Sequence, residues 1–364
     1  MSNEREHVMR IRIITIHNIP NFGSVFQSYA LCKYLISQGY EDTKIIDYNP
    51  DYYNKCTIRA VVGKILNYGA YRRRTKRFRD FVKKYIPITN EKFTDIGQLS
   101  NFDFSADIYI TGGDQLWNVF HDSGRDDAYK LVWTSGEKIS YATSMGQTGF
   151  TQEELQFLAR KLSDFSAISV REASSVRLLE GVGVKAVQCV DPVFLLNSSE
   201  YIKFIKPVNQ PKYLLVYLVN PSKLLDKCIE FLSKKYGLKV ILCSGFSKKC
   251  MCDQFLKDLG PDEILSYIYY ADMILSSSFH ATAFSLIFQK QFFTILPDIH
   301  TNERIIDLLT IRELMHHIIT EKSDLNTVLN DQINYSSIVD YNKYVANSKD
   351  YLKKAIENDE KNYR

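Results

Sequence analysis

Short apolar runs alternate with helical patterns along most of the chain. In the first half, runs rich in Ile, Val and Tyr predict strands at residues 10–16, 44–48, 107–112, 138–144 and 167–172. After the first of these runs, Val25, Tyr29, Cys32 and Ile36 share one face of a helix, which Gly39 ends. This alternation is typical of βα units with parallel strands. We therefore expect an α/β fold.

A second series of the same kind follows FIKPVNQPK, residues 204–212, a polar segment with two prolines that we interpret as a linker. Further strands are predicted at 213–219, 239–245, 272–278 and 291–297, separated by helical patterns. We expect three parts: an N-terminal Rossmann-like domain (1–203), a C-terminal Rossmann-like domain (204–320), and a helical tail (321–364) that packs back on the first domain. In tandem α/β domains a ligand usually binds between the domains, where strands end and helices begin.

Composition limits the class of protein. The 364 residues are 45% hydrophobic and 24% charged, which is typical of a globular chain long enough for two cores. No apolar run is long enough to span a bilayer, and the polar start MSNEREHVMR does not resemble a secretory signal, so we expect a cytoplasmic protein. A net charge of only +4 argues against a dedicated nucleic-acid binder.

Seven cysteines, an odd number lying mostly in apolar segments, favour buried thiols over a disulfide framework. A metal role for Cys250 and Cys252, with Cys243 upstream, is an alternative, but the spacing is a poor match to common zinc sites. We expect no catalytic metal.

The segment 71–85, YRRRTKRFRDFVKKY, holds eight Lys or Arg and a single Asp. Its apolar residues recur at three- and four-residue steps and predict an amphipathic helix with a basic outer face. One interpretation is a solvated helix. The other is a peripheral contact with anionic lipid, or with a lipid-linked diphosphate, at the inner face of the membrane.

Two predicted strand-to-helix turns in the first half carry polar groups and glycine. In HNIPNFGS, Gly23 permits a tight bend and Asn21 can cap the next helix, so free N–H groups could bind an anion or a sugar hydroxyl. The segment TGGDQLWN has two interpretations, a sugar-binding site or a simple glycine turn with a core Trp. The residues concerned are Gly113, Asp114, Gln115, Trp117 and Asn118.

Two further turns place a cation and a histidine at strand ends. Arg171, followed by Glu172, can either bind a carboxylate or phosphate with its fork of N–H groups or form a salt bridge. In SSSFHATAFSL, Ser276, Ser277 and Ser278 precede His280, which lies in the first turn of a helix whose dipole disfavours imidazolium. His280 is either a structural residue or a reactive neutral imidazole.

Five segments, in this order, resemble the landmarks of the polysaccharide pyruvyl transferase family. They are NFGSVFQSYALCKYL, DIYITGGDQLWN, SVREASSV with VDPVFLL, ADMILSSSFHATAFSLIFQKQFFTI, and NERIIDLL, and they span about residues 11–314. The resemblance implies a GT-B-like fold in which two Rossmann-like domains with parallel sheets face each other across a cleft. One position departs from the family pattern, because Ala281 follows the histidine where glycine is common.

The resemblance also implies an activity: transfer of pyruvyl from phosphoenolpyruvate to two hydroxyls of a sugar residue, in a polysaccharide or its lipid-linked precursor, as a ketal with release of phosphate. It implies that Arg171 and His280 are catalytic and meet at the donor. The expected donor-binding residues are Asn21, Gly23, Arg171, Glu172, Ser277, Ser278 and His280, and the expected acceptor-binding residues are Gly113, Asp114, Gln115, Trp117 and Asn118.

This chemistry requires no cofactor, since phosphoenolpyruvate is a co-substrate, and it suits exopolysaccharide or capsule biosynthesis. Two alternatives stay open, because fold alone does not define function. They are a GT-B glycosyltransferase that uses nucleotide sugars and a non-enzymatic carbohydrate-binding protein.

Overall fold

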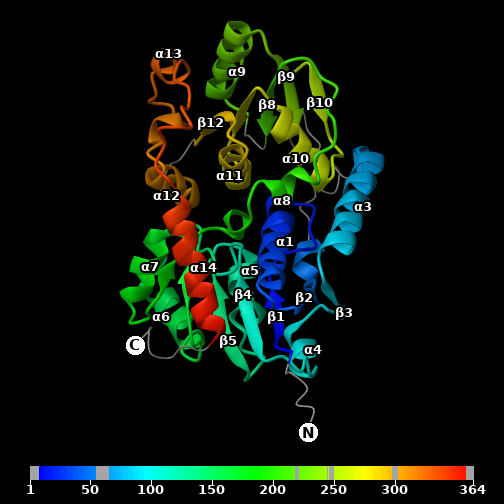
Figure 1. The fold of residues 1–364 in the computed structure, drawn as a ribbon, viewed down its shortest axis with the longest axis vertical. Coiled ribbons are helices and arrows are strands. Elements are labelled where there is room, and N and C mark those ends of the chain that lie inside the picture. Colours follow the sequence, from blue (N-terminus) through cyan, green and yellow to red (C-terminus); the bar gives the residue numbers. More distant parts are fainter. Residues whose placement is uncertain are drawn as a thin grey trace.

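The computed structural model describes the chain as two parallel sheets with helices around them (Figure 1). The residues it describes are 8–54, 65–217, 221–243, 245, 250–296 and 302–357.

The first sheet has five parallel strands in the order β3-β2-β1-β4-β5. Its central positions are isoleucines that are fully buried, such as Ile13 and Ile110, which are paired neighbours on β1 and β4. A short parallel pair, β6 with β7, continues from β5 through isolated bridges. The strands are β1 (Arg10–Ile14), β2 (Asp42–Tyr48), β3 (Ile88–Phe93), β4 (Ile108–Gly112), β5 (Glu137–Tyr141), β6 (Ser169–Val170) and β7 (Val187–Gln188).

Helices connect these strands, as right-handed crossovers between parallel strands require. The longest are α1 and α3. The helical elements of this half are α1 (Phe22–Ser37), η1 (Asp51–Asn54), α3 (Tyr68–Tyr85), α4 (Ile96–Ser100), α5 (Asp122–Arg125), η2 (Asp127–Lys130), α6 (Gln152–Lys161), α7 (Ala173–Glu180), η3 (Pro192–Leu195) and α8 (Ser199–Ile202).

The second sheet is also parallel, in the order β10-β9-β8-β11-β12-β13. Its strands are β8 (Tyr213–Tyr217), β9 (Lys239–Cys243), β10 (Gln254–Leu256), β11 (Met273–Ser276), β12 (Gln291–Ile295) and β13 (Ile318–Ile319). The helical elements that follow β8 are α9 (Lys223–Tyr236), α10 (Pro261–Tyr270), α11 (Phe279–Ile287), α12 (Glu303–Ile311), η5 (Met315–His317), α13 (Leu325–Val328) and α14 (Asn342–Ile356). Two parallel α/β sheets of this kind confirm the expected fold class.

The chain returns to the first sheet at its end. Helix α14 runs beside that sheet (Figure 1), where the Tyr351 hydroxyl donates a hydrogen bond of 2.9 Å to the carbonyl of Ser140 in β5. The Ser348 hydroxyl of the same helix accepts from the backbone N–H of Val190 at 2.9 Å. The C-terminal helix therefore packs on the half of the molecule that the N-terminal strands build.

Aromatic rings join the two halves. Phe22 and Phe26 of α1 contact Phe284 of α11, with ring centroids 5.2 Å and 5.4 Å apart, and Phe22 also contacts Tyr217 at the end of β8. Tyr201 of α8 completes the group. Edge-to-face pairs of buried rings stabilise an interface beyond the area that they bury. The N-terminus of α1 is thereby fixed against α11.

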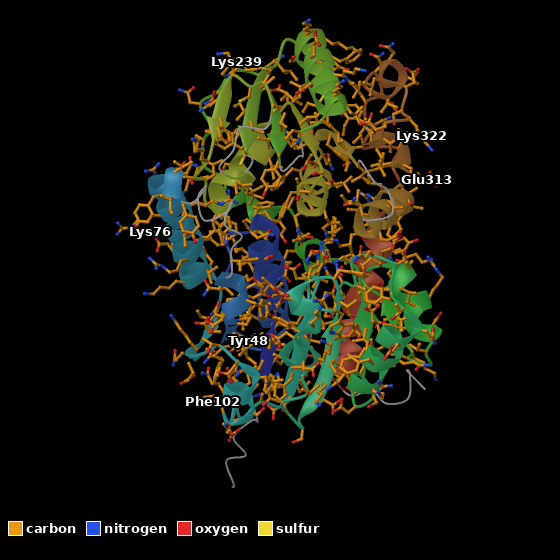
Figure 2. All side chains as sticks on the ribbon, turned by 180° about the vertical axis from the view of Figure 1, so that it is seen from behind. Tyr48, Lys76, Phe102, Lys239, Glu313 and Lys322 are labelled. Carbon is orange, nitrogen blue, oxygen red and sulfur yellow. The ribbon has the colours of Figure 1, made fainter. Side chains whose placement is uncertain are left out.

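Helix α3 is amphipathic, as the 71–85 segment predicts. Phe78, Phe81 and Val82 are buried, and the basic side chains lie on the outer faces, where Lys76 points away from the molecule (Figure 2). Arg73 and Arg77 pair with Asp258 and Glu263 of the second half, at 2.5 Å and 3.0 Å. Part of the basic surface therefore bridges the two halves.

No helix in the described ranges is both long and apolar enough to cross a bilayer. Four of the described cysteines are buried free thiols: Cys32, Cys189, Cys228 and Cys243. Cys56 lies outside the described residues.

Candidate active site

Four strand-to-helix turns meet between the two sheets. From the first half come the turns after β1, β4 and β6, and from the second half comes the turn after β11 (Figure 1). The carboxyl ends of parallel strands gather at one edge of a sheet, and this is where α/β proteins bind ligands. Two other segments reach the same place: the residues before η3, and helix α12.

Arg171 stands at the end of β6 and is 5% exposed. Its Nη2 donates to the carbonyl of Gly113 and lies 2.7 Å from the Asp191 Oδ2. Within the described part of the chain, its Nε and Nη1 make no hydrogen bond. A guanidinium offers five N–H donors in a fixed fork, so Arg171 keeps two buried nitrogens for a ligand.

Asp191 is the anion of the site. It precedes Pro192, which begins η3, and its Oδ1 caps that turn by accepting from the N–H of Val193 at 2.9 Å. Burial alone would raise the pKa of Asp191, but the charge of Arg171 and the proximity of His280 outweigh it and lower the pKa below its usual range. Asp191 is therefore an ionised carboxylate held between a guanidinium and an imidazole.

His280 enters the site from the first turn of α11. Ser278 caps this helix by accepting from the N–H of Ala281. The His280 Nε2 lies 3.4 Å from the Asp191 Oδ2. On its other side the ring contacts Gly23 so closely that a β-carbon there would overlap it. His280 thus lies between Asp191 and the backbone of α1.

Arg304, in the first turn of α12, adds a second guanidinium. Arg171 and Arg304 both lie over the ring of Phe279, at 5.0 Å and 5.6 Å from its centroid. With its amide oxygen turned toward Arg304, Gln115 accepts from Nη2 at 2.5 Å and from Nη1 at 3.1 Å. Burial and the nearby Arg171 lower the pKa of Arg304, as expected for two adjacent cations.

A cavity of about 150 Å³ lies beside these groups. Arg171, Asp191, Phe279 and Arg304 line it together with Asp307. Larger cavities of about 840 and 600 Å³ are lined by the α6–α7 region and by the 335–349 segment, and neither contains Arg171 or His280. The small cavity is lined by two arginines and two aspartates, and the free Nε and Nη1 of Arg171 suit it to an anionic ligand.

The remaining residues of the predicted donor set lie in the turns and helix caps around these groups. Asn21 caps α1 by accepting from the N–H groups of Gly23 and Ser24. Glu172 is fully buried and accepts from the Ser144 hydroxyl, the Met145 N–H and the Ser175 hydroxyl. Its carboxylate therefore holds neighbouring loops, and so it does not face a ligand. Ser277 lies in the turn after β11, one residue before the cap of α11.

The predicted acceptor residues separate into two groups. Asp114 and Asn118 are buried and engaged: Asp114 accepts from the Ser24 hydroxyl at 2.6 Å, and the Asn118 Oδ1 accepts from the N–H of Phe120 at 3.2 Å. Gly113, with φ of +86°, brings its carbonyl to Arg171, a conformation that glycine adopts without strain. Both groups adjoin the arginines.

The interpretation of Trp117 as a sugar-stacking ring is wrong. Its side chain is 0% exposed, its Nε1 donates to the carbonyl of Tyr129 at 3.2 Å, and its ring packs on Phe165. An apolar ring following a strand can either face a cleft or fill a core, and here it fills the core of the first half. The simpler alternative of a glycine turn with a core Trp is the correct one.

Ala281, where the family pattern has glycine, is fully buried in the hydrophobic core and does not line the small cavity. Its methyl group is therefore accommodated by packing within α11, and it leaves the pocket unchanged.

Sequence reasoning did not assign Asp191, Arg304 or Asp307 to the site. Each lies in a motif used for the family resemblance, VDPVFLL or NERIIDLL, so the signal was present in the sequence. What the sequence does not show is that α12 folds back to the end of β6, where Asp307 accepts from the N–H of Ala173 at 2.6 Å.

Comparisons with known proteins agree with this geometry. Solved structures similar to the chain include the UDP-N-acetylglucosamine 2-epimerase from Rickettsia bellii, with 14% identity and a TM-score of 0.57, covering 96% of this chain and 97% of that one. The UDP-GlcNAc 2-epimerase from Neisseria meningitidis has 13% identity and a TM-score of 0.53, and the match covers 95% of this chain and 94% of that one. The UDP-GlcNAc 2-epimerase from Methanocaldococcus jannaschii is also similar, with 13% identity and a TM-score of 0.52, and the match covers 90% of this chain and 93% of that one. At such low identity these likenesses show the GT-B fold alone.

No curated protein matches the chain. The sequence model described as polysaccharide pyruvyl transferase matches residues 21–298, most of the chain, including the turns after β4, β6 and β11. The chain therefore belongs to the polysaccharide pyruvyl transferase family, and it is a transferase.

Proposed function

We propose that this transferase moves pyruvyl from phosphoenolpyruvate to two hydroxyls of a sugar residue, forming a ketal and releasing phosphate. The observation that carries the proposal is the pair of unpartnered, buried nitrogens on Arg171, which lines the same small cavity as Arg304. Phosphoenolpyruvate has a carboxylate and a phosphate, the two groups that a guanidinium fork binds best. Family membership supports the same donor class.

The donor would bind with Arg171 and Arg304 on its anionic groups. Asp191 and Asp307 line the same cavity, so binding of the anion would depend on the free Nε and Nη1 donors of Arg171, together with Arg304, and not on a net positive charge. Because these groups are fixed before the ligand arrives, they stabilise negative charge that develops on the departing phosphate without reorganisation.

His280 is the proposed general acid. Protonation of the methylene carbon of phosphoenolpyruvate makes C2 electrophilic, and one sugar hydroxyl adds to C2. The C2–O bond to phosphate then breaks, and the second hydroxyl closes the ring. Of the two hydroxyl protons, one balances the proton added to carbon and the other leaves with phosphate. His280, next to Asp191, can deliver the proton to the carbon and then take up one hydroxyl proton, while the other hydroxyl proton leaves with phosphate.

The acceptor is a sugar of a polysaccharide or of its precursor. The exposed basic side chains of α3, among them Arg72, Arg79 and Lys83, support a lipid-linked acceptor at an anionic membrane surface. The proposed site of reaction is therefore the cytoplasmic face of the membrane, with an exopolysaccharide or capsule intermediate on a lipid carrier as the acceptor.

The test is direct incubation of the full chain with phosphoenolpyruvate and a panel of lipid-linked and free oligosaccharides. We expect release of inorganic phosphate and an acceptor heavier by pyruvic acid minus water. In parallel, phosphoenolpyruvate should raise the melting temperature. Protection by UDP-sugars alone, with no phosphate released, would instead favour a nucleotide-sugar glycosyltransferase, and acceptor binding without either donor would indicate a carbohydrate-binding protein.

A further inference from the structure

Two histidines and an aspartate gather at the outer part of the second half, away from the residues that line the small cavity. His316 and His317 form the end of η5, and Asp331 follows α13. The Asp331 Oδ2 lies 3.2 Å from the His316 Nε2 and 4.0 Å from the His317 Nε2. The three potential ligand atoms all lie within 4.8 Å of one another.

His317 is held in the form that a metal ligand requires. Its Nδ1 lies 3.2 Å from the carbonyl of Phe292, and since a carbonyl only accepts, Nδ1 carries the hydrogen. The Nε2 of the neutral ring is then a free lone pair. Metal-binding histidines usually use their second nitrogen in this way, which fixes both tautomer and orientation.

No group among the described residues donates a hydrogen bond to the Nε2 lone pair of His317. The side chain is 1% exposed, and its Nε2 makes no hydrogen bond there. The ring is further fixed by stacking on Phe293, with centroids 5.2 Å apart. A buried, oriented and unpartnered acceptor of this kind is costly unless a ligand uses it.

We propose that His316, His317 and Asp331 bind a divalent transition-metal ion of the zinc class. Two imidazoles and a carboxylate are a ligand set typical of Zn²⁺, and three protein ligands leave a position for water. Metal–ligand bonds of about 2.0–2.1 Å in a tetrahedral site separate the ligand atoms by about 3.3 Å. The His316–Asp331 distance already matches this separation. Both of these side chains are exposed and can turn toward His317.

An ordinary ion pair explains less. An exposed His–Asp pair contributes little to stability, and it leaves the His317 Nε2 without a partner. A bound ion would use all three groups at once. It would also join the segment after α13 to η5 and the edge strand β13, so its role is to fix this end of the second sheet.

The experiment is titration of the chelator-treated full chain with Zn²⁺ by isothermal calorimetry, with melting temperature as a second readout. We expect one saturable site and a higher melting temperature with the metal. His316→Ala and Asp331→Asn change exposed side chains and should leave the fold intact. Each should weaken binding at least about tenfold, since loss of even an indirect ligand contact costs that much.

Matched controls identify the site. His121→Ala removes an exposed histidine elsewhere, and the double variant Cys250→Ser with Cys252→Ser removes the thiols that could also bind zinc. Both should bind like the wild type. Unchanged affinity in His316→Ala and Asp331→Asn, loss of binding in the cysteine variant, or absence of saturable binding to the wild type would each overturn the proposal.

Discussion

The imidazole of His280 lies directly against the Cα of Gly23, although the two residues come from helices on different sheets. A β-carbon at position 23 would lie 1.9 Å from the His280 Nδ1 and 2.5 Å from its Cε1. No side chain fits in that space. Gly23 is thus the residue that allows α1 and α11 to approach until His280 reaches Asp191.

Gly23→Ala should therefore inactivate the enzyme while the protein stays folded. The glycine is in a helix, where alanine is intrinsically preferred by about 1 kcal/mol, so the backbone itself does not oppose the change. We expect phosphate release to fall about 100-fold or more, because a displacement of about 1 Å at a reacting group has that effect. Gly149→Ala, where a methyl meets only an ordinary contact, is the control and should be fully active.

Arg171→Lys and His280→Ala test the two central groups. Lysine keeps the charge of Arg171 but loses the fork, so kcat/KM for phosphoenolpyruvate should fall about 100-fold. Loss of a general acid at His280 should lower kcat by about 10²–10⁴. Circular dichroism checks that each variant is folded. Near wild-type turnover in both variants would defeat the assignment.

Trp117→Phe separates a core role from a sugar-binding role. The indole is buried and its Nε1 donates to Tyr129, so the smaller ring should lower the free energy of unfolding by about 1–3 kcal/mol. The KM for the acceptor should not change, because no face of the ring is accessible to a sugar. A higher KM for the acceptor in a folded variant would indicate that Trp117 contacts the acceptor after all.

Asp307 gives the stability a pH dependence. Burial raises its pKa to about 6, with Glu172 and Glu303 adding to the effect against the opposing hydrogen bond from Ala173. Since the folded state holds this proton more tightly, the stability it contributes is full below about pH 4 and is lost as pH rises through about 6. The free energy of unfolding of Asp307→Asn should rise by about 1–2 kcal/mol relative to that of the wild type as the pH goes from about 4 to above 6, after allowance for solvent screening. Urea unfolding of both proteins at pH 4.5 and pH 7 measures this difference. The same change in free energy of unfolding with pH in the wild type and the variant would contradict the assignment to Asp307.

The outer face of α3 can be tested by charge reversal. Changing Arg72, Arg79 and Lys83 to Glu should reduce co-sedimentation with phosphatidylserine vesicles about tenfold or more, since each basic residue near such a surface contributes about 1 kcal/mol. The KM for a lipid-linked acceptor should rise, and that for a free oligosaccharide should not. Reversal of Lys223, Lys227 and Lys322, exposed on the second half, is the charge-matched control. Equal sedimentation of all three proteins would reject the membrane contact.

The sequence predicts the fold where the hydrophobic pattern is strong. The expected strands at 10–16, 107–112 and 272–278 appear as β1, β4 and β11, and in β1 and β11 the last two residues of each run belong to the turn toward the site. Strands 213–219, 239–245 and 291–297 are found up to Tyr217, Cys243 and Ile295, and parts of their predicted ends lie outside the described residues. The edge strands β3, β10 and β13 were not expected, since ITNEKF is mostly polar and the other two have only two or three residues.

The site was harder to predict than the fold. Arg171 and His280 stand at strand ends, which sequence patterns locate, and the structure brings both to Asp191. Arg304 and Asp307 reach the site only because α12 crosses to the other half, a tertiary relationship with no local pattern. Trp117 shows the opposite difficulty, because burial of a ring beside a polar turn depends on what packs above it.

Helix α3 and helix α12 join the two halves at opposite flanks of the molecule (Figure 1), and the two joints are not equally strong. The ion pairs of Arg73 and Arg77 are well exposed, and each is worth about 1 kcal/mol or less. The α12 flank instead combines the Asp307 contact with two arginines packed on Phe279. Because salt screens exposed charges most, added salt should weaken the α3 joint and leave the α12 joint nearly unchanged.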